Sequence, residues 1–203
     1  VLVTGANSGL GLETAKALLA KDAKVIMGCR SIEKGQAAAS ELLQKINSGS
    51  IELLKIDLGD LTEVSRAADH LISKYGRLDL LINNAGLMAP PLTLSKQGLE
   101  IQFAVNHLGH MALTLKLFPL MAQQKGSRVV TVSSGAQYMG KICWDDLQGE
   151  KIYDRWAAYS QSKLPNVMFA LKLHERIQRS KGEVSSLAAH AGLARTNLQL
   201  TSV

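Results

Sequence analysis

Short apolar runs alternate with longer segments of helical period along the whole of this 203-residue chain. The first run, VLVTG, precedes a helical segment over 10–20, whose inward face we expect to carry Leu10, Ala17 and Leu18. Strands that alternate with helices are joined by right-handed crossovers, which make the sheet parallel and cover both of its faces. The pattern predicts an α/β fold with a doubly wound parallel sheet, Rossmann-like, in a single domain.

The later elements follow the same alternation. Ser31 stands where the N-cap of the second helix is expected. No composition shift or repeat divides the chain, so we expect 1–203 to be one dinucleotide-binding domain, truncated at both abrupt ends. The further strands expected are KVIMGCR, IELLKID, LDLLINNAG, SRVVTVSS and VSSLAAHAG, and the further helices are SIEKGQAAASELLQKI, 61–75, 94–125 and 157–180.

Composition argues against several classes of function. Basic residues exceed acidic ones by six, but they form no run and few aromatic residues lie among them, so no nucleic-acid partner is expected. Cys29 and Cys143 match no metal or redox spacing, which favours a reduced, cytoplasmic protein. The longest apolar runs are too short to span a bilayer, so no membrane segment is expected within this sequence, while an anchor outside it stays open.

A glycine-rich turn, TGANSGLG, joins the first strand to the first helix. Gly5, Gly9 and Gly11 let the backbone approach a pyrophosphate, and the free N–H groups of a helix start favour its negative charge. Their spacing differs from the G-x-G-x-x-G fingerprint, although the mechanics are the same. The turn indicates a bound dinucleotide, against the alternative of a tight turn without ligand.

Arg30 follows the second expected strand. An acidic residue there would bind the ribose hydroxyls and exclude a 2′-phosphate, whereas a guanidinium can bind that phosphate. The sequence therefore predicts NADP as the cofactor, against the alternative of a solvated surface arginine.

Tyr159 and Lys163 lie four residues apart in a helical segment, so their side chains share one face. A nearby ammonium favours the phenolate, and we expect it to lower the tyrosine pKa from about 10 toward neutrality, where a phenol can exchange protons. Taken alone, such a pair is more often a tyrosine packed on a lysine stem, because short motif matches are mostly accidental.

Several motifs occur together in one order along nearly the whole chain. TGANSGLG, NNAG at 83–86, VNHLGH around Asn106, VTVSS at 130–134 and the Tyr159–Lys163 pair resemble the short-chain dehydrogenase/reductase family. GCRSIEKG, DLQGEK and YSQSKLPN resemble its retinol dehydrogenase-related branch. The resemblance implies an NADP-dependent oxidoreductase that moves a hydride between nicotinamide and a small-molecule alcohol or carbonyl, apolar ones included.

The resemblance also implies residue roles. Tyr159 is the general acid/base, Lys163 lowers its pKa and holds the nicotinamide ribose, Ser134 orients the carbonyl and Asn106 supports a water-linked proton path. Ser133 stays open as the alternative to Ser134. The implied cofactor-binding residues are Gly5, Asn7, Ser8, Gly9, Leu10, Gly11, Arg30, Asp57, Leu58, Asn84, Ala85, Gly86, Tyr159, Lys163 and Thr196.

Other features leave alternatives. His107 and His110 lack identifiable further ligands, so we expect helix packing and no metal. The two long helices, 94–125 and 157–180, are apolar enough for a homodimer. A non-catalytic dinucleotide-binding regulatory or interaction protein is the alternative function, although it would not need the four catalytic residues together. Four residues either line an apolar substrate pocket or belong to the core: Met88, Tyr138, Trp144 and Trp156.

Overall fold

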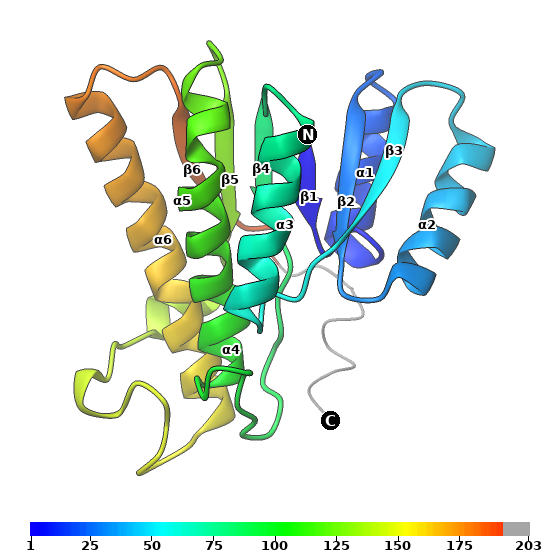
Figure 1. The fold of residues 1–203 in the computed structure, drawn as a ribbon. Helices are drawn as coiled ribbons and strands as arrows, with labels where there is room; N and C mark the ends of the chain where they lie inside the picture. The colour runs from blue at the N-terminus through cyan, green and yellow to red at the C-terminus, as the bar shows by residue number, and fades with distance from the viewer. Residues whose placement is uncertain (193–203) are drawn as a thin grey trace.

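The computed structural model describes residues 1–192, which form one parallel sheet with helices on both faces (Figure 1). The strand order is β3-β2-β1-β4-β5-β6. This confirms the predicted doubly wound sheet. The strands are β1 (Leu2–Thr4), β2 (Lys24–Cys29), β3 (Ser50–Lys55), β4 (Leu80–Asn83), β5 (Arg128–Val132) and β6 (Ser185–Ala189).

Helices connect the strands and carry local capping signals. The expected N-cap is confirmed, because the Ser31 hydroxyl accepts a hydrogen bond from the Lys34 N–H. No helix within residues 1–192 is long and apolar enough to cross a membrane. The helices are α1 (Gly9–Leu19), α2 (Ile32–Lys45), α3 (Leu61–Lys74), α4 (Ile101–Phe103), η1 (Ala104–Leu108, a π-helix), α5 (Gly109–Ala122), η2 (Gly135–Met139), η3 (Trp144–Asp146) and α6 (Arg155–Arg179).

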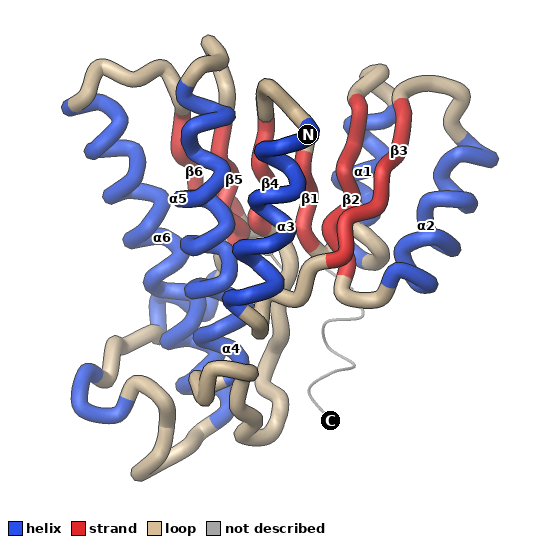
Figure 2. The backbone as a smooth tube through the Cα atoms, viewed as in Figure 1, coloured by secondary structure: helices blue, strands red, loops and turns tan. Residues whose placement is uncertain are grey.

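Both faces of the sheet are buried, and neighbouring strand residues serve opposite faces. Leu2 and Ile26 belong to the core that α3, α5 and α6 cover, whereas Val3 and Met27 belong to the core under α1 and α2. Figure 2 shows α3, α5 and α6 in front of the strands. Strands buried on both sides need continuous apolar runs, which explains why these segments do not alternate with polar residues.

The face of α1 that packs on the sheet differs from the prediction. Gly11, Ala15 and Leu19 are its buried residues, while the expected Leu10 and Ala17 are exposed and Leu18 is only partly buried. The buried residues recur every four positions, and because Gly11 and Ala15 are small the first turns of α1 lie close to the sheet.

The helix predicted over 94–125 begins later and changes its winding. The chain first turns at Gly98, which has a φ of +75°, and Leu94 bridges to Glu100. The Glu100 carboxylate then caps α4 by accepting from the Gln102 and Phe103 N–H groups. The π-helical turn η1 follows and carries Asn106, and such turns are concentrated at functional sites.

The strand order reverses between β1 and β4, and all six strands end at the same edge of the sheet. In Figure 1 this is the lower edge, next to α4 and the segment between β5 and α6. Open α/β sheets bind ligands in the crevice outside such a reversal point.

Candidate active site

A cleft of about 430 Å³ opens at the reversal point, over the carboxyl ends of the strands. Its wall includes Met88 and the catalytic candidate Ser134, together with residues that the sequence analysis did not single out, such as Thr4 and Leu87. Thr196 lies outside the described residues. The predicted cofactor-binding residues that line the cleft are Gly5, Asn7, Ser8, Gly9, Leu10, Arg30, Asp57, Leu58, Asn84, Ala85, Gly86, Tyr159 and Lys163.

The glycine turn is held tightly beneath this cleft. Gly5 has a φ of +65°, and its N–H donates to the Gly28 carbonyl at 2.8 Å. Gly11 lies behind the turn and does not line the cleft. A Cβ on Gly11 would come within 2.3 Å of the Gly5 carbonyl oxygen, so only glycine fits there. Gly11 therefore allows α1 to start close enough to aim its N-terminus at a phosphate.

Thr4 links this turn to the loop that follows β4. Its Oγ1 accepts from the Asn84 N–H at 2.9 Å and the Ala85 N–H at 3.0 Å, and its carbonyl accepts from Asn84 Nδ2 at 2.8 Å. The sequence analysis missed Thr4, although its place at the end of the first strand, directly before Gly5, was a usable signal.

Tyr159 and Lys163 project from α6 toward the end of β5. The Lys163 Nζ lies 5.7 Å from the centre of the Tyr159 ring, and both residues are buried. The Ser134 side chain lies near enough to Tyr159 to lower the pKa of the phenol, whereas the Ser133 hydroxyl donates to the Lys163 carbonyl at 2.8 Å. The geometry thus brings Ser134, and not Ser133, to the phenol.

Burial is the main cause of the pKa shifts of Tyr159 and Lys163. It raises the pKa of the Tyr159 phenol, an effect that the Ser134 side chain partly offsets. Complete burial lowers the pKa of Lys163 to about 8. Burial thus acts against the expected lowering of the Tyr159 pKa by Lys163, which stays a prediction.

Asn106 lies behind the cleft wall, and its side-chain amide is fully engaged. Oδ1 accepts from the Leu87 N–H at 2.7 Å, and Nδ2 donates to the Leu87 carbonyl at 3.0 Å and to Ser162 Oγ at 2.8 Å. Ser162 in turn donates to the Tyr159 carbonyl at 2.7 Å. Asn106 thus ties the loop after β4 to the helix that carries Tyr159.

Arg30 is exposed at the end of β2 and borders a second cavity of about 420 Å³ beside the cleft. Lys55 and Lys96 line the same cavity, together with Asp57, which also lines the cleft. The carboxylates of Asp60 and Glu63 line this cavity too, and Lys96 is paired with Asp60 at 3.1 Å. Arg30 and Lys55 are therefore the cations left to meet an anionic group.

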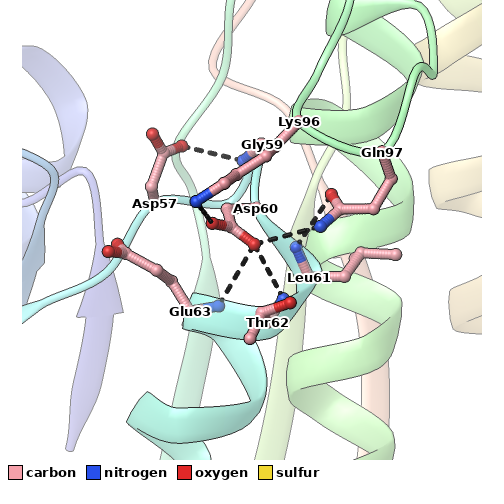
Figure 3. Close-up of polar contacts among 8 residues, drawn as sticks. All are labelled: Asp57, Gly59, Asp60, Leu61, Thr62, Glu63, Lys96 and Gln97. Atoms are coloured by element: carbon pink, nitrogen blue, oxygen red, sulfur yellow. Dashed lines mark hydrogen bonds and ion pairs between the residues drawn. The ribbon is translucent and has the colours of Figure 1, made fainter.

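Asp60 organises the rim of the second cavity (Figure 3). Its carboxylate caps α3 by accepting from the Thr62 and Glu63 N–H groups, and it also accepts from Gln97 Nε2 at 3.0 Å and Lys96 Nζ at 3.1 Å. These bonds, those from Gln97 and Lys96 first, hold the pKa of Asp60 well below its usual range. The turn at 95–98 is thereby fastened to the start of α3.

We expect Asp60→Ala to lower the unfolding temperature by several degrees at pH 7, because the cap and both side-chain bonds are lost. The folded-state pKa of Asp60 is depressed, so its contribution is complete above the unfolded carboxyl pKa of about 3.9 and is lost as the pH falls below it. The difference from the parent should therefore shrink below about pH 4. Calorimetry between pH 3 and pH 7 measures this, with Asp60→Asn as the matched variant that keeps the cap acceptor.

The structure also places the histidine and aromatic residues whose roles the sequence left open. His107 packs, since its Nδ1 is 3.1 Å from Asn166 Oδ1 and its ring meets Phe103. Within residues 1–192 no three His, Cys, Asp or Glu side chains are placed to share a metal ion. Tyr138 and Trp144 are exposed and do not belong to the core, while the half-exposed Trp156 ring stands edge-on to Tyr159.

Known proteins resemble this chain over nearly its whole length. The family model described as short chain dehydrogenase matches residues 1–202. Human retinol dehydrogenase 12 is 40% identical over 198 residues, and mouse retinol dehydrogenase 14 is 41% identical over 208 residues. Each alignment covers 98% of this chain but 62% of the relative, so the chain spans less than two thirds of the length of these curated relatives.

Solved structures share the fold. An uncharacterized protein from Mycobacterium paratuberculosis is 44% identical with a TM-score of 0.85, over 99% of this chain and 70% of that one. A short-chain dehydrogenase from Sphingobium yanoikuyae, solved in complex with NADPH, has a TM-score of 0.79 over 99% of this chain and 73% of that one. The latter is 19% identical, so its likeness concerns the fold alone.

Proposed function

The chain belongs to the short-chain dehydrogenase/reductase family, and from that premise we propose that it is an NADP-dependent oxidoreductase acting on an alcohol or a carbonyl compound. The observation that carries the proposal is the contact between Tyr159 and Ser134 in the same cleft as the glycine turn. A binding protein without catalysis would need the turn but not this pair. Several relatives are named for retinol, an apolar alcohol, and Leu87 and Met88 in the cleft wall support an apolar substrate for this chain as well.

The residues present fit a dinucleotide, because Ser8, Gly9 and Leu10 line the cleft at the start of α1, where the first N–H groups of a helix have no partner within the helix. NADP(H) supplies or accepts the hydride when it is bound. The Tyr159 hydroxyl then gives a proton to the substrate oxygen, or takes one from it. The Ser134 hydroxyl donates a second hydrogen bond to that oxygen, where negative charge develops. Lys163, buried near the Tyr159 ring, carries positive charge in the cleft below about pH 8.

A preference for NADP over NAD is proposed from Arg30. Its guanidinium borders both the cleft and the second cavity, and Lys55 borders that cavity too. A 2′-phosphate carries the charge that these side chains attract, whereas a ribose hydroxyl does not.

Arg30→Asp should reverse this preference, because a carboxylate repels the 2′-phosphate and can accept from the ribose hydroxyl instead. Hydrogen bonds to charged groups are worth about 1.5–3 kcal/mol, so NADPH affinity should fall by roughly tenfold to a hundredfold. Fluorescence titration of NADPH and NADH measures both affinities. Arg176→Asp, at the far end of α6, serves as the control and should change neither. Equal affinities for both cofactors in the parent protein would contradict the proposal.

Pairing of two chains is proposed through α5 and α6. Leu115 on α5 is 54% exposed, and Met168 and Leu171 on α6 are 49% and 66% exposed. Both helices cover the same face of the sheet (Figure 1), and exposed apolar side chains on such helices suit a two-fold interface. We expect sedimentation at micromolar concentration to show a dimer in the parent and a monomer in Leu171→Glu; a monomeric parent contradicts the pairing.

The two cysteines support a reducing compartment such as the cytoplasm. Cys29 is buried, Cys143 is exposed, and the structure leaves both thiols free. Free thiols are typical of proteins kept reduced.

A further inference from the structure

His110 is a buried histidine that the catalytic roles above do not use. It is the second residue of α5 and is 1% exposed. Its Nε2 lies 2.8 Å from Thr4 Oγ1, and its Nδ1 lies 3.1 Å from the Asn106 carbonyl oxygen. The ring therefore joins the residue beside the glycine turn to the backbone of the residue that holds the loop after β4.

The donors and acceptors around Thr4 decide which ring nitrogen carries the proton. Thr4 Oγ1 already accepts from two backbone N–H groups, those of Asn84 and Ala85, which uses both of its lone pairs. Its own proton goes either to His110 Nε2 or to the Ile82 carbonyl, and the nitrogen is nearer, at 2.8 against 3.3 Å. Nε2 is therefore the acceptor.

The other side of the ring leads to the same tautomer. With Nε2 unprotonated, Nδ1 carries the proton and donates it to the Asn106 carbonyl. The opposite tautomer would bring a third donor to Thr4 and would set the Nδ1 lone pair against a carbonyl oxygen. Complete burial lowers the pKa of His110 to about 3, and the charge of Lys163 acts in the same direction. The ring is accordingly neutral at physiological pH, a fixed donor and acceptor rather than a proton carrier.

The hydrogen bonds then run in one direction through the site. The Asn84 and Ala85 N–H groups donate to Thr4, Thr4 donates to His110, and His110 donates to Asn106. From the amide of Asn106 the line continues to Ser162 and to the backbone of the Tyr159 helix. The loop at 84–87 is thus clamped at one end by Thr4 and at the other by Asn106, and His110 connects the two clamps.

We propose that His110 is a positioning residue, which keeps the cleft wall at 84–87 in register with Tyr159 by holding the Asn106 carbonyl to Thr4. The inference rests on the proposed function, because this register matters for turnover only if the transfer takes place in the cleft. Misplacement of reacting groups by about 1 Å can cost about a hundredfold in rate.

Two substitutions test the two hydrogen bonds of the His110 ring separately. The amide nitrogen of asparagine reaches the position of Nδ1, so His110→Asn can still donate to the Asn106 carbonyl. The glutamine amide reaches the position of Nε2, so His110→Gln can accept from Thr4 but leaves that carbonyl without its donor. We expect kcat to fall about tenfold or more in His110→Gln, with NADPH affinity nearly unchanged, and His110→Asn to restore most of the loss.

Thr114→Val is the matched control. Thr114 lies one turn further along α5 and accepts from Asn83 Nδ2 at 2.8 Å, so this substitution removes another bond between α5 and the sheet without touching the line through His110. It should lower the unfolding temperature but leave kcat at the parental value. An unchanged kcat in His110→Gln, or an equal loss in the Gln and Asn variants, would overturn the proposal.

The tautomer gives a readout that does not depend on turnover or on any variant. Long-range proton–nitrogen spectra of the whole protein, labelled with ¹⁵N at histidine, report which nitrogen of His110 is protonated. A proton on Nδ1 supports the assignment, and a proton on Nε2 refutes it. A parent protein that binds NADPH but reduces no aldehyde or ketone would contradict the proposed function, whereas the spectrum would still judge the hydrogen-bonded line.

Discussion

Tyr159→Phe should abolish turnover while NADPH still binds. The substitution removes one hydroxyl, which is the proton donor to the substrate oxygen and the partner of the Ser134 side chain. General acid/base catalysis contributes about 10²–10⁴-fold, and the loss should be at least that large because the orienting contact with Ser134 is lost as well. The glycine turn, Arg30 and Lys163 are untouched, so the cofactor keeps its other proposed contacts and should still bind.

The measurement is single-turnover oxidation of NADPH against a panel of aldehydes and ketones, with cofactor affinity titrated in parallel. Tyr138→Phe is the matched control, because that tyrosine is 83% exposed and lies outside the cleft wall. A Tyr159→Phe protein with near-parental turnover would refute the assignment of the acid. A parent protein that binds NADPH but turns over no substrate would instead favour the non-catalytic alternative.

The sequence was sufficient for the architecture because the sheet is buried on both faces. Runs such as VLVTG must be apolar throughout, and that requirement is visible without any tertiary information. Prediction from the sequence failed where small residues or local turns decide which residues are buried or where a helix begins. The buried face of α1 is set by Gly11 and Ala15, which carry too little apolar surface to register in a pattern, and the turn at Gly98 interrupts a segment that otherwise has helical period.

The site was predictable to the same extent. Residues that follow strand ends, such as Arg30 and Asp57, could be placed at one edge from topology alone. Contacts between elements could not, since nothing in the sequence shows that Ser133 turns toward the Lys163 backbone while Ser134 meets Tyr159. The direction of the Tyr159 pKa shift depended on burial, which spacing along a helix does not reveal.

Gly11→Ala should strongly weaken cofactor binding, although Gly11 does not line the cleft. The added Cβ would lie 2.3 Å from the Gly5 carbonyl oxygen and 2.5 Å from Asn84 Nδ2. Neither atom can yield easily, because the Gly5 N–H is bonded to the Gly28 carbonyl and the Asn84 amide to the Thr4 carbonyl. The turn and the loop after β4 must therefore both move away from the phosphate position.

Overpacking of this kind costs about 1–3 kcal/mol of folding stability, and the displaced N–H groups should weaken NADPH binding by about a hundredfold or more. Gly76→Ala is the control, since its Cβ would meet nothing within 4 Å and should leave NADPH affinity unchanged. Titration of NADPH together with thermal unfolding separates the two effects, because a merely destabilised protein would bind normally once folded at low temperature. Parental affinity in folded Gly11→Ala would mean that the cofactor does not use this turn, and the origin of binding would have to be sought elsewhere along the sheet edge.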